Sequence, residues 1–370
     1  MSERKQNKKI DNKAPVIVGV GDFTDRSKED GLNPQELLSK ASQLAIKDSG
    51  IKDLNKQIDY VGVVRFSVDF LTATNQSSFQ YSNFPRTLSN KLGIQATNEV
   101  YAPMGGNSPQ VLLEDALIKI SSGETDCALL AGGEALQTMI ARLKAGMSLD
   151  WLDEPGGNPE MIGNNAIGFS EHEKIHGMDL PTNVYPLFAQ SLRKKDNKTA
   201  EQHLKECSSL FSEFSKVASN NPYSWFPTLR SEEEIASVTK NNRLVGFPYT
   251  KYLNSVIRVN MSSAYILMSQ TKADELGVSQ NKRVYVHGCS ILDDIWNVSE
   301  RPNFHSSPAI KTCVNQTLEQ AEVSFDDISH FDLYSCFPSA VQIAKEELGI
   351  PEEKKDLTIT GGLPYFGGPG

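Results

Sequence analysis

The sequence of 370 residues has no long hydrophobic run and no excess of positive charge. The apolar run at 16–20 is ended by Asp22, short of a signal peptide's apolar segment and of the ~20 apolar residues of a membrane span. The formal net charge is −9, whereas binding to nucleic acid or to anionic lipid needs clustered Lys and Arg. We therefore expect a cytoplasmic protein that binds neither nucleic acid nor a membrane.

Paired cysteines are also absent, because the cysteines are odd in number and none lies in a CxxC spacing. The five are Cys127, Cys207, Cys289, Cys313 and Cys336. Disulfide frameworks and zinc ribbons depend on such pairs. The sequence predicts reduced, mostly buried thiols.

Only one spacing suggests a metal. His172-Glu-Lys-Ile-His176 matches the HExxH pattern, in which two histidines one helical turn apart hold zinc and the glutamate activates water. Gly177 and Pro181 end that helix at once, and no third ligand is apparent, so we expect no metal. The run Val18-Gly-Val-Gly-Asp22 lacks the third glycine of a dinucleotide loop, so we expect no nicotinamide cofactor either.

The composition that is present, 39% apolar and 22% charged, is that of a globular protein long enough for two core-forming units. The basic run from Arg4 to Lys13 contains no apolar stretch. We expect residues 1–14 to form a disordered, solvated arm.

The region 15–139 is predicted to be a half in which strands and helices alternate. Strands are expected at 15–20, 59–64, 99–101 and 126–131. The first helix has a complete set of signals: Asn33 as N-cap, Glu36 three residues later as a capping box, and Gly50 as C-cap. A second helix is expected to begin at Ser108 and to end near Gly123.

The region 251–370 repeats the order of strand, proline-started helix and Asp-bearing strand, which indicates a duplicated fold. The expected elements are a helix-bearing connection at 261–276, strands at 284–287, 327–334 and 357–360, and helices at 308–321 and 338–348. Between the halves, 140–250 is rich in Asn, Pro and aromatic residues, and it is predicted to be a partly helical insertion that forms a lid. The expected fold class is α/β, with two related βαβαβ halves.

Two Gly-Gly segments are the candidate binding residues. The first glycine site comprises Met104, Gly105, Gly106 and Asn107. The second glycine site comprises Gly361, Gly362, Gly367 and Gly368. Glycines let main-chain N–H groups approach a ligand, and the first site leads into a helix start whose dipole is positive there. Both sites are therefore predicted to bind a carbonyl oxygen.

Three boxes in the right order resemble the thiolase superfamily, most closely the bacterial and sterol-carrier-protein-2 (SCP2)-type thiolase-like proteins. Gly105 to Glu134 is similar to the family's stretch from the nucleophile loop to the next strand. Leu333-Tyr-Ser-Cys-Phe337 stands at its Asn-Glu-Ala-Phe or His-Asp-Cys-Phe box, and Gly361 to Pro369 stands at its Gly-Gly to Gly-His-Pro box. The resemblance implies a layered α/β/α/β/α core whose C-terminal half is incomplete at residue 370.

At these same three motifs the sequence differs from that of a catalytically active thiolase. By the resemblance, the nucleophilic cysteine falls on Gly106, the Asn or His that holds an oxyanion water falls on Tyr334, and the histidine of Gly-His-Pro falls on Gly368. Claisen chemistry needs a thiolate to carry the acyl group and a base to take the α-proton, and glycine supplies neither. We expect no acyl-enzyme at position 106.

The resemblance implies a protein of the acyltransferase class, similar to acetyl-CoA acetyltransferases of lipid metabolism, that binds acyl-CoA between Gly106, Tyr334 and Gly368 and needs no cofactor. Two alternatives stay open. One is an acyl-CoA retro-aldolase or lyase that uses Tyr334 as acid or base, with Cys336 as a displaced nucleophile. The other is a noncatalytic CoA-binding scaffold subunit that works with another polypeptide, such as a small OB-fold protein. The resemblance also implies a homodimer.

Overall fold

The computed structural model describes residues 11–27, 30–67, 81–164 and 166–368. The chain divides into two compact units. The first unit comprises Met1–Gly163 and Asn260–His287, and the second comprises Asn164–Val259 and Gly288–Gly370. Most of the arm expected at 1–14 lies outside the described residues. Its last part is held in place, because Asn12 O accepts hydrogen bonds from both Thr271 N and Thr271 Oγ1, each at 2.9 Å.

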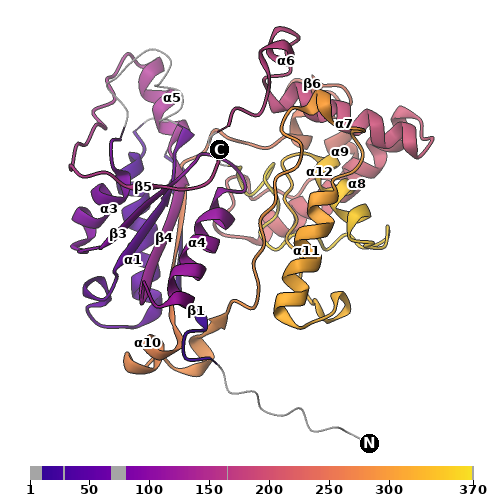
Figure 1. Ribbon diagram of the computed structural model, residues 1–370. Coiled ribbons are helices and arrows are strands. Elements are labelled where there is room, and N and C mark those ends of the chain that lie inside the picture. The colour runs from indigo at the N-terminus through magenta and orange to yellow at the C-terminus, as the bar shows by residue number, and fades with distance from the viewer. Residues whose placement is uncertain (1–10, 28–29, 68–80, 165, 369–370) are drawn as a thin grey trace, which may run out of the picture. The chain divides into compact units, whose positions relative to one another are not determined.

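A seven-stranded mixed sheet forms the centre of the first unit, in the order β5-β3-β2-β4-β8-β1-β9 (Figure 1). Its strands are β1 (Pro15–Thr24), β2 (Tyr60–Val64), β3 (Asn98–Ala102), β4 (Cys127–Glu134), β5 (Glu160–Met161), β8 (Met261–Ser269) and β9 (Val284–Tyr285). The neighbours β5, β3, β2 and β4 are parallel. Strand β8 is antiparallel to β4 and β1, and β1 is antiparallel to β9.

Helices cover both faces of this sheet. The helices of the unit are α1 (Pro34–Ser49), α3 (Phe84–Leu92), α4 (Ser108–Ser122), α5 (Leu136–Lys144) and α10 (Gln270–Glu275), with 3-10 turns at Leu54–Lys56 and Gln280–Lys282. Side chains of α1, α3 and α5 share one buried cluster with one face of the sheet, and those of α4 share another cluster with the opposite face. The unit is therefore an α/β/α sandwich.

Strand β2 shows how alternation divides the two clusters. Val61 and Val63 pack on the α1 side, whereas Tyr60 and Val64 pack on the α4 side. All five residues of the strand are buried, as expected for a central parallel strand covered on both faces.

Helix α1 begins and ends where its sequence signals place it. Asn33 Oδ1 accepts a hydrogen bond from Glu36 N at 2.9 Å, Glu36 Oε2 accepts one from Asn33 N at 3.0 Å, and Gly50 has a φ of 70°. The glycines of β1 have a packing role against this helix. A Cβ at Gly19 or at Gly21 would lie 2.3 Å from a main-chain oxygen of α1.

The prediction of a helix-bearing connection at 261–276 is wrong for most of that segment. Residues Met261–Ser269 form β8, which inserts between β4 and β1, and only the short α10 follows. Both faces of β8 are largely buried. A strand of this kind carries a continuous apolar run without period-2 alternation, and such a run resembles a buried helix in sequence.

The second unit is mainly helical. Its elements are α6 (Glu171–Ile175), α7 (Pro181–Lys195), α8 (Ala200–Asn220), α9 (Glu232–Ala236), α11 (Pro308–Ala321), α12 (Pro338–Glu347), β6 (Leu244–Gly246) and β7 (Tyr249–Thr250), with 3-10 turns at Lys251–Leu253, Val298–Glu300 and Phe325–Asp327. Its largest core cluster is built from α8, α9, α12 and β7, and includes Phe211, Phe214 and Phe337. No helix among the described residues is long and apolar enough to cross a membrane.

The repeat expected after residue 284 is realised only in part. Strand β9 belongs to the sheet of the first unit, and the described residues of 327–334 and 357–360 form no strands. These two segments share one main-chain hydrogen bond, from Leu333 N to Leu357 O at 2.9 Å, rather than a ladder. Helix α11 forms as predicted but has no buried residue. A strand needs a neighbouring strand that pairs its main-chain N–H and C=O groups, and this part of the described chain contains no such strand.

Candidate functional site

The first glycine site lies in the first unit, between β3 and α4. Met104 and Gly105 are half-buried, while Gly106 and Asn107 are exposed. Asn107 is the N-cap of α4, but its side chain makes no capping hydrogen bond. The helix begins at Ser108, so Pro109 is its second residue, where its missing N–H leaves no donor unsatisfied.

Main-chain N–H groups are available at this site. Ser108 N donates to Gly105 O at 3.0 Å, and Val111 N donates to Asn107 O at 3.2 Å. Within the part of the chain that the structure describes, the N–H groups of Gly106 and Asn107 donate to no acceptor. They precede the positive end of the α4 dipole, a position that favours an anion or the oxygen of a polarised carbonyl.

The second glycine site lies in the second unit, and its glycines are buried. Gly361, Gly362 and Gly367 have φ values of 115°, 76° and 132°, in the region that favours glycine. A Cβ at Gly361 would lie 2.4 Å from the Cβ of Ala218, and one at Gly368 would lie 1.8 Å from Ser255 Oγ. Packing and backbone conformation therefore account for glycine here, and ligand binding at this site stays a prediction.

The structure brings the segment of Tyr334 and Cys336 against the second glycine site. Ser335 Oγ accepts a hydrogen bond from Leu363 N at 3.1 Å and lies 3.0 Å from the place of a Cβ on Gly362. The segment is also held by Ser255 N, which donates to Cys336 O at 3.0 Å. The Tyr334 side chain is 51% exposed, whereas that of Cys336 is only 5% exposed.

The Cys336 thiol is poorly suited to be a nucleophile. Burial raises its pKa to about 12, although the phenols of Tyr185 and Tyr334 act on the pKa in the opposite direction. The pKa of the Tyr334 phenol also lies above its ordinary value, because neighbouring protein atoms displace water and because the sulfur of Cys336 is close. Both groups are protonated at neutral pH, so Tyr334 is available as a hydrogen-bond donor or an acid.

The HExxH segment is used for helix capping. Glu173 accepts hydrogen bonds from Ser170 N and Ser299 N, each at 2.7 Å, and these bonds lower its pKa to about 2. The His172 and His176 rings contact each other with centroids 4.7 Å apart. Over the described ranges there is no group of three or more His, Cys, Asp or Glu side chains that could hold a metal ion.

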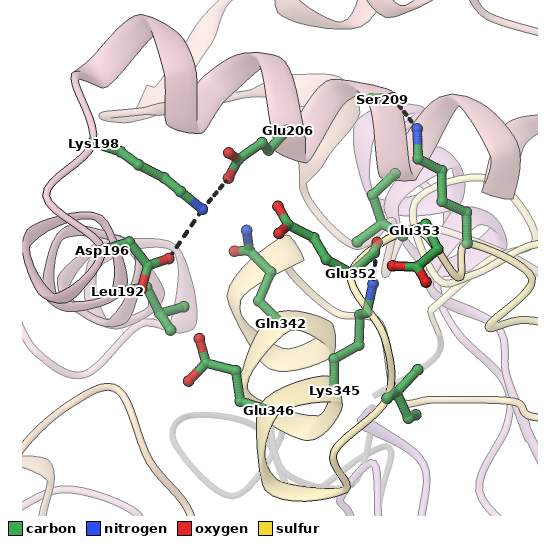
Figure 2. A pocket seen from close by; sticks show the side chains of 13 residues that line it. Leu192, Asp196, Lys198, Glu206, Ser209, Gln342, Lys345, Glu346, Glu352 and Glu353 are labelled. Atoms are coloured by element: carbon green, nitrogen blue, oxygen red, sulfur yellow. Dashed lines mark hydrogen bonds and ion pairs between the residues drawn. The ribbon is translucent and has the colours of Figure 1, made fainter.

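A cavity of about 690 Å³ lies in the second unit beside α8 and α12, and none of its lining residues was predicted from sequence (Figure 2). Leu192, Leu210 and Ile350 form its apolar part. Its lysines have partners: Lys198 Nζ lies 2.8 Å from Glu206 Oε2, and Lys345 Nζ donates to Glu352 O at 2.8 Å.

Sequence reasoning also missed Tyr185, which lies on α7 and interacts with Cys336. The only signal was an aromatic cluster at 185–188, in a region without regular alternation. A contact between residues 151 positions apart leaves no local pattern in the sequence.

Comparison with solved structures identifies similar proteins. The chain is 32% identical to a monomeric SCP2-thiolase-like protein type 1 from Mycobacterium smegmatis, with a TM-score of 0.78 over 97% of this chain and 69% of that chain. It is 16% identical to the Ltp2–ChsH2(DUF35) aldolase, with a TM-score of 0.67 over 96% of this chain and 86% of that one. It is also 16% identical to an acetyl-CoA acetyltransferase from Syntrophomonas wolfei, with a TM-score of 0.60 over 95% and 88% of the two chains.

A scan of protein-family models and a search of curated proteins gave no match. The structural matches confirm the thiolase-like α/β fold that the three sequence boxes imply. The two matches at 16% identity concern the fold alone.

Proposed function

The chain belongs to the SCP2-thiolase-like family, and on this basis we propose that it binds acyl-CoA thioesters at the N-terminus of α4 without forming an acyl-enzyme. The observation that supports this function is the exposed pair of N–H groups at Gly106 and Asn107, which have no acceptor among the described residues. A thioester carbonyl oxygen placed there accepts both donors. Donors of this kind stabilise a developing oxyanion by about 3 kcal/mol each in acyl chemistry.

The glycine at position 106 excludes an acyl-enzyme at this residue. Glycine has no group that can attack the carbonyl carbon, so the thioester stays on coenzyme A while its carbonyl is polarised. The protein is then nominally of the acyltransferase class but does not transfer an acyl group through residue 106.

A second candidate function is an acyl-CoA lyase, and the state of Tyr334 favours it. The phenol is half-exposed and protonated, and its neighbour Cys336 is a protonated thiol. In a retro-aldol cleavage the bond between the α and β carbons of a 3-hydroxyacyl thioester breaks, the hydroxyl proton passes to water, and the α carbon of the thioester enolate takes a proton. Tyr334 is the acid that we propose for this last step.

Partners and location are parts of the same proposal. The M. smegmatis relative is monomeric, and the Ltp2 aldolase is a complex with a DUF35 protein. The homodimer, the OB-fold partner and the cytoplasmic location expected from the sequence stay predictions. Light scattering of the purified chain, alone and mixed with a DUF35-type protein, tests the first two.

The test of thioester binding is ligand-induced thermal shift. We expect acetyl-CoA to raise the Tm by mass action, with ligand at 100 times its Kd adding about 2.7 kcal/mol. Gly106→Val should abolish the shift, because a branched side chain covers the two N–H groups. Gly168→Val is the matched control, since Gly168 is exposed and a Cβ there would have no neighbour within 4 Å. A wild-type protein without any shift would rule the proposal out.

Formation of the carbonyl product together with the shortened acyl-CoA from a 3-hydroxyacyl-CoA tests the lyase, because retro-aldol cleavage leaves the thioester bond intact. Turnover that is lost in Tyr334→Phe, while the thermal shift remains, supports an acid role for the phenol. A thermal shift without turnover in the wild type supports the scaffold alternative instead.

A further inference from the structure

Arg65 is a positive charge without a counter-ion at the carboxyl edge of the sheet in the first unit. It directly follows β2 and is half-buried. Its side chain donates to no acceptor among the described residues, and its Nε is buried without a hydrogen-bond partner. Moving a guanidinium partly out of water without pairing it costs free energy. We therefore looked for what this side chain is placed to bind.

Two contacts fix the position of Arg65. Its main-chain N donates to Ala102 O, at the end of β3, at 3.1 Å. Its guanidinium lies over the ring of Tyr101, with the central carbon 4.8 Å from the ring centroid. Tyr101 is only 1% exposed, so the ring is a fixed platform. The face of the ring attracts the cation, but it does not satisfy the N–H donors in the plane of the guanidinium.

The buried carboxylates of the neighbouring strands are already engaged by other donors. Glu99 on β3 accepts hydrogen bonds from Arg86 Nε and, at 3.0 Å, from Asn83 Nδ2. Glu134 at the end of β4 accepts from Ser67 N at 2.9 Å and from a second main-chain N–H at 3.0 Å. Arg86 therefore has a buried carboxylate partner, whereas the Arg65 guanidinium has none among the described residues.

Arg65 and the first glycine site lie at the same edge of the sheet. Strands β2 and β3 are parallel, and the glycine site follows β3 as Arg65 follows β2. Gly106 is four residues beyond Ala102, and a chain of that length spans at most about 14 Å. A ligand as long as an acyl-CoA can therefore extend from the N–H groups of Gly106 and Asn107 to the Arg65 guanidinium.

We propose that Arg65 binds an oxyanion, a carboxylate or a phosphate group, at the carboxyl edge of β2. A guanidinium presents paired N–H donors that match two oxygens of either group. In an acyl-CoA this oxyanion has two sources, the phosphates of coenzyme A and a carboxylate at the far end of a dicarboxylic acyl group. The inference deepens the thioester proposal and rests on it for the identity of the ligand. The oxyanion site itself does not depend on it.

Binding of matched thioesters tests which source the oxyanion has. Succinyl-CoA and butyryl-CoA have acyl groups of the same length, and only the first ends in a carboxylate. A lost charge-assisted hydrogen bond lowers affinity about 10-fold to 100-fold. If Arg65→Gln raises the Kd of succinyl-CoA by this factor and leaves that of butyryl-CoA unchanged, the oxyanion is the acyl carboxylate. An equal loss for both thioesters assigns it to the phosphates of coenzyme A. Unchanged Kd values for both contradict the proposal.

Two further variants accompany this titration. Arg65→Lys keeps a positive charge and loses the fork of donors, so we expect it to recover part of the lost affinity. Arg142→Gln is the matched control, because Arg142 belongs to the same unit and already has a partner, with Nη2 2.8 Å from Asp30 Oδ1. It should leave the Kd of both thioesters unchanged.

Chemical protection tests the oxyanion site without a thioester and without a variant that has to fold. Phenylglyoxal modifies arginine side chains, and peptide mass spectrometry gives the rate at each arginine. Inorganic pyrophosphate or succinate, each at several millimolar, should slow the reaction of Arg65 severalfold and leave the rate at Arg142 unchanged. A rate at Arg65 that neither anion lowers overturns the inference, even where thioesters bind. Protection of Arg65 in a protein that binds no thioester leaves the oxyanion site standing and removes the proposed function.

Discussion

Gly361 has no side chain because helix α8 leaves no room for one. A Cβ at this residue would meet the Cβ of Ala218 at 2.4 Å and its nitrogen at 2.6 Å, and the φ of 115° is itself unfavourable for other residues. The sequence alone does not distinguish a glycine that contacts a ligand from a glycine that packs against a helix. The two roles differ in what substitution does to the protein without ligand.

We expect Gly361→Ala to destabilise the ligand-free second unit by clearly more than 1 kcal/mol, since strain of φ and overpacking add. Gly349→Ala is the matched control, because Gly349 also has a positive φ, 63°, but a Cβ there would have no neighbour within 4 Å. It should lose only about 1 kcal/mol. Urea denaturation measures both. Equal losses would show that α8 tolerates the methyl group, and the ligand role of the second glycine site would regain its support.

Glu173 gives a prediction on pH. Its folded-state pKa is lowered from 4.5 to about 2 by main-chain donors at Ser170 and Ser299. A lowered carboxyl pKa contributes stability that is complete above the unfolded value, near 4.5, and that is lost as the pH falls toward 2. Glu173→Gln should therefore remove about 1 kcal/mol at neutral pH and flatten the dependence of unfolding free energy on pH in that window.

Glu171→Gln is the control for this measurement. Glu171 lies on the same short helix, is exposed, and has its carboxylate 3.8 Å from the Lys174 ammonium group. It should leave both the stability at neutral pH and its acid dependence nearly unchanged. The same slope in wild type and Glu173→Gln would contradict the capping role.

At the scale of single elements, prediction from the sequence succeeded where the signal is local. The start of α1 depends on Asn33 and Glu36, three residues apart, and both of their reciprocal hydrogen bonds form. The start of α4 at Ser108, after the Gly-Gly pair, was predicted in the same way, and ligand binding by that pair stays a prediction. Prediction failed for β8, whose strand character depends on β4 and β1 on either side of it, far away in sequence. Tyr185 was missed for the same reason, because its partner Cys336 lies on a distant segment.

The N-terminus of α4 should change the chemistry of a thiol placed there. We expect Gly106→Cys to have a thiol pKa below the usual value of about 8.5, because two N–H groups and the helix dipole favour the thiolate. Its alkylation by iodoacetamide at pH 7, followed residue by residue with mass spectrometry, should be faster than that of Gly168→Cys, which lies in an exposed loop. Equal rates would mean that the helix start does not favour negative charge, and thioester binding would lose its physical basis.

At the scale of the molecule, the first unit follows the sequence more closely than the second. Its strands and helices bury each other, so each strand finds the neighbours that its apolar pattern requires. In the second unit, α11 forms with an apolar stripe that includes Ile310 and Leu318, yet none of its residues is buried. An apolar stripe in the sequence predicts that one face of a helix packs against other apolar residues. It does not show whether the described chain supplies those residues.

Because the two compact units have separate cores, we expect a core substitution to destabilise the unit in which it lies and not the other unit. Leu129 on β4 and Phe214 on α8 are both fully buried, in different clusters. Leu129→Ala should cost about 2–5 kcal/mol and Phe214→Ala about 3–5 kcal/mol, from lost transfer energy and the cavity that remains. Hydrogen exchange followed by mass spectrometry should show faster exchange in β2, β4 and β8 for the first variant, and in α8 and α12 for the second. Equal acceleration of both units in either variant would show that the chain unfolds as one cooperative body, since protection follows the cooperative unit to which an amide belongs.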